Sequence, residues 1–423
     1  MTTVGTRKRP RLLHVTTTDM SLGWLLEPQL HAFADAGFEV VTASAPGPMV
    51  TRLLDAGIGH EPIHSFARSI DPTADIRAGK ELRSVLGTLS PDIVHTHNPK
   101  PGVMGRILAR RRSGPAVVNT VHGLYAQPTD SIKRRLAVYG IERAAAAFSD
   151  AELVQSIEDV DTLVRLGVPS ERVHLLGNGI DLNRFRRTPT VRAQSAVLRR
   201  QLGIGPNVPI VGAVGRLVWE KGYRDLFAAV EQLRASNRSP FEVVIVGPEE
   251  TGKSDAIGQR DIDEMSRLGV HFLGARDDID VLLEMFDIFV LASRREGFPR
   301  AAMEACAMGV PVVTTNIRGC RQVVRDGHNG LLYEPGDSRQ LAGAIHTLID
   351  EEITRRRLGV NGISRAQVEF DQERVISRTL SVYRSLLGKR SERYDSSINA
   401  VDRAASKSGP VSAAPAASLE RSA

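Results

Sequence analysis

The sequence has little cysteine and no long apolar run. Its 423 residues include only two cysteines, Cys306 and Cys320, which excludes a disulfide framework and metal sites built on cysteine pairs. No stretch approaches 18 consecutive apolar residues, so no transmembrane helix is expected. The basic start at residues 7–11 leads into only two leucines before polar residues return, too short for a signal-peptide core. These absences favour a cytoplasmic location.

A strong net charge is also missing. The 55 basic and 49 acidic residues give a formal charge of +6, too weak over this length to indicate a nucleic-acid partner. Two clusters of cations stand out, one closing a predicted helix and one opening another. Such runs are most often solvated helix faces, and the alternative is peripheral contact with an anionic membrane surface. The two clusters are Arg106, Arg110, Arg111 and Arg112, and Lys133, Arg134 and Arg135.

The sequence alternates short β-branched runs with longer amphipathic segments, which is typical of parallel sheets covered by helices. The predicted strands are 11–16, 38–43, 92–97, 115–121 and 171–176 in a first set, and 208–214, 241–247, 270–274, 287–291 and 311–315 in a second. Predicted helices include 24–36, 73–89 and 131–147. The fold class is therefore α/β, with two Rossmann-like domains.

A break near residues 177–190 separates the two sets, and the domains are predicted at 1–185 and 186–370. Residues 371–388 are predicted as an amphipathic helix, and the Ser- and Ala-rich residues 389–423 as a disordered tail. Ligands of open α/β sheets bind at the carboxyl ends of the strands. Two sheets that face each other would therefore form one cleft between the domains.

One local motif favours a different function. Residues 247–254 fit the phosphate-binding loop pattern G-x-x-x-x-G-K-[ST] after a predicted strand. However, Pro248 removes a backbone donor, and Glu249 and Glu250 would lie close to the phosphates. The nucleotide-hydrolase interpretation is therefore disfavoured.

The most informative segment is 293–311, in which Glu296 and Glu304 are eight positions apart. A strand ends before it, a Gly-Phe-Pro turn follows Glu296, and a helix of small residues then begins. The free N–H groups at such a helix start bind anions. Glu296 would face sugar hydroxyls, and Glu304, two turns into the helix, can reach a ribose. The alternative is one helix-terminal acid and one exposed acid.

Two cations follow the first strand of the second set. Arg216 and Lys221 lie in the glycine-flanked segment 215–222, and both can point at the cleft, where they would neutralise a diphosphate. Surface salt bridges are the alternative.

Together these residues resemble the retaining, nucleotide-sugar-dependent glycosyltransferases of the GT-B fold, in the large family 4. The resemblance covers about residues 11–388 and rests on the GR-x4-KG segment, the EGFP…E block and the segment 178–185. It implies transfer of a hexosyl or N-acetylhexosaminyl group from a nucleotide-diphosphate sugar, UDP- rather than GDP-linked, with retention and without metal or cofactor. The acceptor is expected to be a glycan or a lipid-linked sugar of the cell envelope. The C-terminal helix is expected to cross back to the N-terminal domain.

The resemblance also assigns roles to residues of the second domain. It implies that Arg216 and Lys221 bind the diphosphate, that Glu296 contacts the transferred sugar and that Glu304 binds the ribose. Arg276 occupies the place where the base is read. Phosphate oxygens would be held by backbone amides near Gly297, Phe298 and Pro299.

Four residues of the first domain match more loosely. Gly23 resembles the glycine that lets the backbone approach the donor phosphate, and His122 the histidine near the reacting sugar. His95 and His97 end a predicted strand and are expected on the acceptor side. A lone histidine is more often structural.

One segment departs from the family pattern. The usual Gly-Gly-x-x-Glu is here Arg-Gly-Cys-Arg-Gln at 318–322, which leaves the donor sugar open and predicts added positive charge near it. Two other functions stay open: a sugar-nucleotide epimerase of the same architecture, and a catalytically inactive nucleotide-binding protein.

Overall fold

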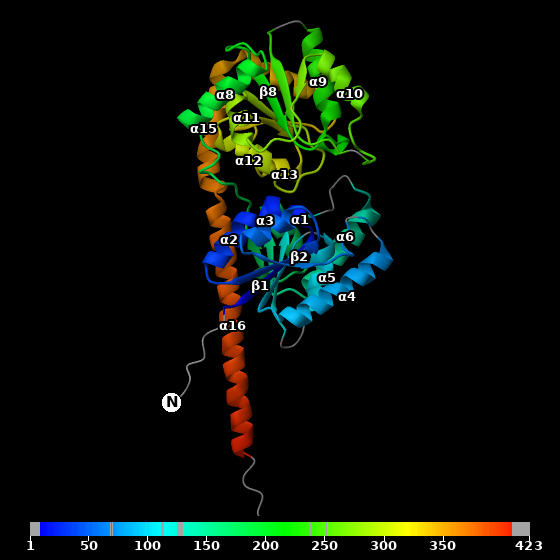
Figure 1. The fold of residues 1–423 in the computed structure, drawn as a ribbon, viewed down its shortest axis with the longest axis vertical. Helices are drawn as coiled ribbons and strands as arrows, with labels where there is room; N and C mark the ends of the chain where they lie inside the picture. Colours follow the sequence, from blue (N-terminus) through cyan, green and yellow to red (C-terminus); the bar gives the residue numbers. More distant parts are fainter. Residues whose placement is uncertain are drawn as a thin grey trace, which may run out of the picture.

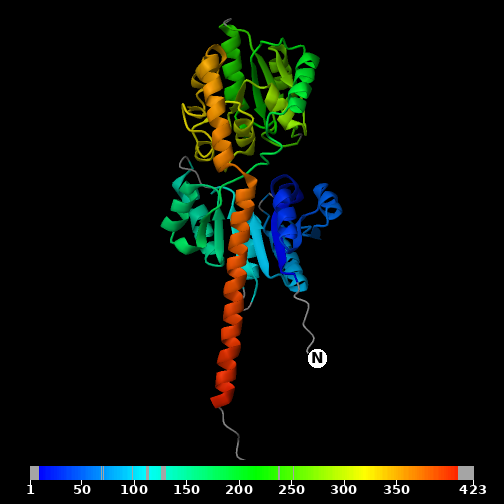
Figure 2. The same ribbon diagram turned by 90° about the vertical axis from the view of Figure 1, so that its left-hand side faces the viewer.

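The computed structural model describes residues 9–407, except 68, 70, 98, 111–113, 125–129, 237–238 and 251. Two helix-covered sheets lie one above the other, and a long C-terminal helix runs along the lower one (Figures 1 and 2). All pairings within both sheets are parallel. The two predicted Rossmann-like domains are thus confirmed.

The N-terminal domain contains a seven-stranded sheet in the order β3-β2-β1-β4-β5-β6-β7. Its strands are β1 (Arg11–Thr18), β2 (Glu39–Ala45), β3 (Gly59–Pro62), β4 (Ile93–His97), β5 (Ala116–Val121), β6 (Ala151–Val154) and β7 (Val173–Leu175). Its helices are α1 (Asp19–Ser21), η1 (Leu22–Leu26), α2 (Glu27–Asp35), α3 (Met49–Asp55), α4 (Pro72–Leu89), α5 (Pro99–Ala109), α6 (Ile132–Ala146), α7 (Ile157–Arg165) and η2 (Ser170–Arg172).

The second domain contains a six-stranded sheet in the order β10-β9-β8-β11-β12-β13. Its strands are β8 (Ile210–Val214), β9 (Glu242–Val246), β10 (Val270–Phe272), β11 (Ile288–Leu291), β12 (Val312–Thr315) and β13 (Gly330–Tyr333). Its helices are α8 (Pro189–Gln201), η3 (Trp219–Lys221), α9 (Tyr223–Ala235), α10 (Gln259–Arg267), α11 (Ile279–Met285), α12 (Arg300–Ala307), α13 (Arg318–Arg321), α14 (Ser338–Asp350) and α15 (Glu352–Glu369).

Strand order reverses once in each sheet, between β1 and β4 and between β8 and β11. Both central strands are buried on both faces, so the apolar side chains of β-branched runs such as IVGAV in β8 pack against helices on each side. Ligands of such sheets bind outside the carboxyl ends of the strands at the point of reversal. The loops after β1, β4, β8 and β11 are therefore the expected ligand-binding loops.

The C-terminal helix α16 (Gln372–Lys407) lies against the N-terminal domain, as expected (Figure 2). Its residues Val375, Ile376 and Tyr383 are buried in the core of that domain. Helix α16 runs past residue 388, where the predicted helix ends, and through residues 389–407 of the segment predicted as a tail. Extending an existing helix costs little once its first turns are formed. Residues 408–423 lie outside the described part of the chain.

All ten predicted strands are present, and three strands were missed. β3 and β13 are four-residue strands at the sheet edges. β6 carries Glu152, a buried acid that interrupts its apolar pattern. No helix of the described residues combines the length and the apolar character needed to cross a membrane.

Candidate functional site

Lys221 and Glu296 meet at the point of strand reversal of the second sheet. Gly222 has a φ of +77°, and a Cβ there would lie 1.8 Å from the carbonyl oxygen of Ala292. Glycine therefore lets the loop after β8 press against the end of β11. This contact brings Lys221 Nζ to 2.6 Å from Glu296 Oε1, with both side chains partly buried. A small pocket beside Tyr223, between the ends of β8 and β11, is also lined by Lys221.

Arg216 lies in the same loop but has another partner. Its Nη1 is 3.2 Å from Glu250 Oε1, and Lys253 Nζ is 2.5 Å from Glu250 Oε2. These hydrogen bonds, that of Lys253 first, lower the pKa of Glu250. The structure thus places Arg216 and Lys221 in separate ion pairs. Glu250, the acid that pairs with Arg216, belongs to residues 247–254, the segment that fits the phosphate-binding loop pattern.

The turn at Gly297 contacts the N-terminal domain. A Cβ on Gly297 would lie 1.9 Å from the carbonyl oxygen of His122. Gly123, with a φ of +109°, would carry its Cβ 2.8 Å from the Gly297 Cα. Two glycines therefore allow the loop after β5 to touch the loop after β11, next to the predicted sugar-binding acid Glu296. This interdomain contact was not predicted from the sequence.

Helix α12 begins directly after this turn, with Pro299 as its N-cap. Glu304 on α12 is largely buried, and burial raises its pKa, although Arg300 lies 3.9 Å away. The Phe298 carbonyl accepts a hydrogen bond of 3.1 Å from the Asn178 amide, so the interdomain segment 178–185 holds the turn in place. The structure therefore gathers Glu296, the turn and Glu304 on one side of the domain interface.

Two other predicted donor residues have local partners. The Arg276 guanidinium donates to the Asp278 carboxylate at 2.8 and 2.5 Å, and these hydrogen bonds lower the pKa of Asp278. Gly23 lies in η1, where a Cβ would come within 2.9 Å of Met49 Sδ on α3. The carbonyl of the next residue, Trp24, accepts a hydrogen bond of 3.4 Å from Arg300 at the start of α12. Gly23 thus lies beside the turn, and a side chain there would displace the Met49 side chain on α3.

The prediction that His95 and His97 face an acceptor is wrong. Both side chains are buried, and alternate residues of β4 share one face of the sheet. His95 contacts Tyr383 on α16, and His97 Nδ1 is 3.1 Å from His122 Nε2. Their remaining nitrogens are also hydrogen-bonded, so neither ring has one free for a substrate. His122 is held by His97 and Gln155, and burial lowers its pKa to about 4.

Residues 318–322, which differ from the family's Gly-Gly-x-x-Glu pattern, form ion pairs with the N-terminal domain. They do not add free charge near the donor sugar. Arg318 Nη1 lies 2.9 Å from Asp159 Oδ1, and its Nη2 donates to the Leu124 carbonyl. Arg321 pairs with Glu158 at 3.3 Å. The expectation of added charge is therefore corrected, because the cations pair with acids at the start of α7. No signal in the sequence identifies these partners, which lie in the other domain.

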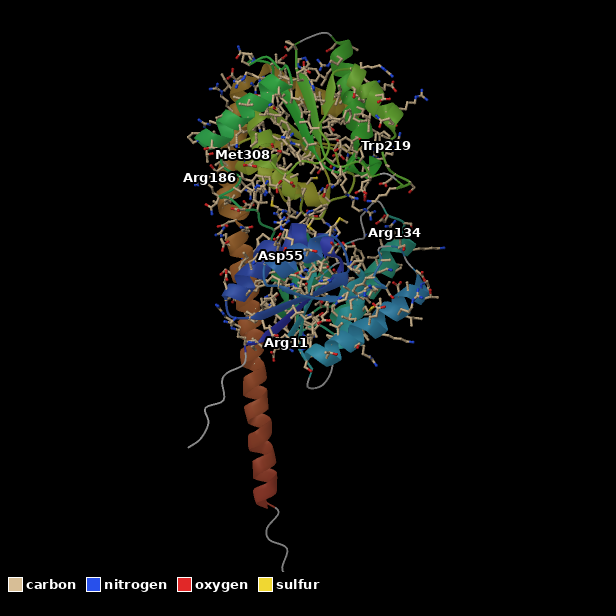
Figure 3. The ribbon with its side chains drawn as sticks, viewed as in Figure 1. Arg11, Asp55, Arg134, Arg186, Trp219 and Met308 are labelled. Carbon is tan, nitrogen blue, oxygen red and sulfur yellow. The ribbon has the colours of Figure 1, made fainter. Side chains whose placement is uncertain are left out.

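The residues of the two basic clusters differ in how exposed they are. Arg106 is wrongly predicted as a surface cation: its side chain is 1% exposed and pairs with Glu142 at 2.9 Å and Glu152 at 2.7 Å. Arg110 is 40% exposed and pairs with Asp150. Lys133 and Arg134 are exposed on α6, Arg135 is partly buried, and Figure 3 shows Arg134 at the outer edge of the domain. Arg111 and Arg112 lie outside the described residues.

Comparisons with known proteins agree with this architecture. The family model "Glycosyltransferase Family 4" matches residues 29–184, and "Glycosyl transferases group 1" matches residues 194–365. The UDP-Gal:alpha-D-GlcNAc-diphosphoundecaprenol alpha-1,3-galactosyltransferase of Escherichia coli is 31% identical over 310 residues, which are 73% of this chain and 79% of that protein. The N,N'-diacetylbacillosaminyl-diphospho-undecaprenol alpha-1,3-N-acetylgalactosaminyltransferase of Campylobacter jejuni is 25% identical over 362 residues, 84% of this chain and 93% of that protein.

Solved structures share the fold. HepE of Anabaena, crystallised in complex with UDP and glucose, superposes with a TM-score of 0.74 at 23% identity, covering 89% of this chain and 100% of that one. The matched families span both domains, and the Escherichia coli relative is matched over most of its length. The chain therefore belongs to the family 4 glycosyltransferases of the GT-B fold.

Proposed function

We propose that this glycosyltransferase moves a sugar from a UDP-sugar to an acceptor hydroxyl, with retention at the anomeric carbon and without a bound metal ion. The observation that carries the proposal is the Lys221–Glu296 pair, 2.6 Å apart at the strand reversal and next to the His122 loop of the other domain. A cation and a sugar-binding acid side by side suit a glycosyl diphosphate. Retention is supported by the resemblance of the EGFP…E block to retaining enzymes.

The charges of the site suit departure of a nucleoside diphosphate. Cleavage of the sugar–phosphate bond places negative charge on the leaving oxygen. The Lys221 ammonium and the N–H groups at the start of α12 would stabilise that charge in place of a metal ion. When the donor binds, Arg216 would leave its ion pair with Glu250 and bind the diphosphate instead. The donor would likewise part Lys221 from Glu296, freeing the carboxylate to accept hydrogen bonds from sugar hydroxyls.

Nucleotide selectivity and stereochemistry test this proposal. UDP, but not GDP, should raise the melting temperature, since a ligand of the native state stabilises it. With an α-linked UDP-sugar and an acceptor, NMR of the product should show an α linkage and release of UDP. A β-linked product would contradict retention. Epimerised donor without an acceptor would identify the epimerase, and stabilisation by GDP alone would overturn the choice of base.

We further propose a lipid-linked acceptor and peripheral contact with the inner face of the cell membrane. The two relatives are named for sugars on diphosphoundecaprenol. On α6, Ile132 and Leu136 are 72% and 68% exposed and lie one turn apart, beside the exposed Lys133 and Arg134. An apolar pair flanked by cations suits the surface of an anionic bilayer.

Replacing both Ile132 and Leu136 with asparagine should weaken binding to phosphatidylglycerol vesicles about ten-fold or more, because two apolar side chains no longer enter the bilayer. Sedimentation measures the binding at low and high salt. The matched control replaces Ile353 and Val360, an exposed apolar pair on α15 in the other domain. Wild-type protein that does not bind vesicles, or an equal loss in the control, would contradict membrane contact through α6.

A further inference from the structure

A cluster of buried aromatic and imidazole side chains joins the sheet of the N-terminal domain to α16. His14 on β1 and His95 and His97 on β4 are buried, as is Tyr383 on α16. Ring nitrogens of the three histidines lie within 4.8 Å of one another, which is the composition of a metal site. Each of their six nitrogens, however, already has a hydrogen-bond partner. The contacts therefore favour a hydrogen-bonded network over an ion.

The contacts form one continuous chain that begins at the domain interface. Gln155 Nε2 lies 3.3 Å from His122 Nδ1, and His122 Nε2 lies 3.1 Å from His97 Nδ1. His97 Nε2 is 2.9 Å from His14 Nδ1, and His14 Nε2 is 3.4 Å from the Tyr383 hydroxyl. The chain ends with Tyr383 to His95 Nδ1 at 2.5 Å and His95 Nε2 to Thr120 Oγ1 at 2.7 Å.

Neutral imidazoles give this chain a single direction. Burial lowers the pKa of His14 to about 3 and of His122 to about 4, and lowers the pKa values of His95 and His97 well below 6.5. Each neutral ring has one donor and one acceptor nitrogen. Because the Gln155 amide donates to His122 Nδ1, His122 must carry its hydrogen on Nε2. Every later donor is then fixed, down to His95 Nε2–H donating to Thr120.

Tyr383 is the link that joins the two halves of the chain. Its oxygen accepts from His14 and its hydrogen goes to His95, so it needs both functions of a hydroxyl. Loss of the hydroxyl leaves a buried donor on His14 and a buried acceptor on His95 without partners. The Gln155 amide still donates to His122 Nδ1, so the hydrogen of His122 stays on Nε2. The loss instead leaves the His14 ring, and through it the His97 ring that accepts from His122, less firmly held.

We propose that Tyr383 is a positioning residue: through His14 and His97 it holds the orientation of the His122 ring, and so holds the His122–Gly123 loop against Gly297. The C-terminal helix thereby completes the transfer site from the far side of the domain. This inference rests on the proposed function for its kinetic consequence, but not for the orientation of the His122 ring.

Tyr383→Phe is the direct test, because the ring keeps its packing against Phe33 and Phe38 while the hydroxyl is lost. We expect kcat to fall about ten-fold, the effect of one net hydrogen bond, with the donor KM within about two-fold. In ¹⁵N NMR of the imidazole rings, the Nε2 shift of His122 should change, because its acceptor, the His97 ring, is held less firmly. The matched control is Thr379→Val, which removes another buried hydroxyl of α16 that bonds only the helix carbonyl of Val375; it should alter neither measurement.

The proposal is overturned if the His122 nitrogen shifts stay unchanged in Tyr383→Phe while those of His14 and His95 move. One zinc ion per purified chain, with activity lost to a chelator, would also overturn it in favour of a metal site. If Tyr383→Phe does not fold, Thr120→Val breaks the same chain at its end, and the same NMR change is expected. Wild-type protein that is inactive with every UDP-sugar would refute the proposed function, whereas the nitrogen shifts of His122 would still decide this inference.

Discussion

Replacing Lys221 with alanine should lower turnover by two to three orders of magnitude while the fold stays intact. Lys221 is the cation nearest to Glu296 among the contacts described, at 2.6 Å. Removal of one preorganised group that stabilises developing charge typically costs about 10²–10³ in rate. The same pair is partly exposed, so its loss should change the free energy of unfolding by no more than about 1 kcal/mol. Steady-state kinetics and denaturant unfolding measure the two effects.

Arg234→Ala is the matched control for Lys221→Ala. Arg234 forms a partly buried ion pair with Glu242 at 3.5 Å, at the start of β9 and thus at the opposite end of the strands of the same sheet. Its loss should leave turnover within a few-fold of wild type. The role of Lys221 is refuted if Lys221→Ala also stays within a few-fold, and weakened if its unfolding free energy falls enough to explain the lost activity.

The positions of Lys221 and Glu296 at one edge of the sheet were predictable because their signals are local, although their ion pair was not predicted. Arg-x4-Lys-Gly follows a β-branched run, and Glu-Gly-Phe-Pro precedes a helix of small residues, so strand order alone brings both segments to one edge. What the sequence did not reveal is the contact of Gly297 with the loop of His122 and Gly123. Glycine is required at position 297 because the carbonyl oxygen of His122, in the other domain, leaves no room for a Cβ. No local sequence pattern indicates such a contact.

Long-range partners also explain the wrong predictions. β6 was missed because Glu152 interrupts its apolar pattern, and Arg106 was placed on the surface because three further arginines follow it closely in the sequence. Both errors have the same cause: one ion pair buries two charges from segments 46 residues apart. Similarly, the alternation in β4 shows that His95 and His97 share a face, but only the position of α16 shows that this face is covered.

Replacing Arg106 with alanine should have the largest effect on stability, about 3–5 kcal/mol of the free energy of unfolding of the N-terminal domain, because it leaves a buried carboxylate without its cation. Glu152 is fully buried and accepts further hydrogen bonds from Asn119 at 2.8 Å and Ser149 at 2.5 Å. Burial already raises its pKa. Without Arg106 the pKa should rise further.

The pH dependence and a neighbouring arginine make the test of Arg106 specific. A carboxyl whose pKa is raised in the folded state takes up a proton on folding at intermediate pH, so its destabilising effect grows as pH rises and shrinks as pH falls. The deficit of Arg106→Ala should therefore be smaller at about pH 5 than at about pH 8, as measured by denaturant unfolding. Arg110→Ala is the matched control, because Arg110 directly follows the last residue of α5 and forms an exposed pair with Asp150. Its loss should cost less than about 1 kcal/mol at either pH, and an equal deficit in the two variants would contradict the role of burial at Arg106.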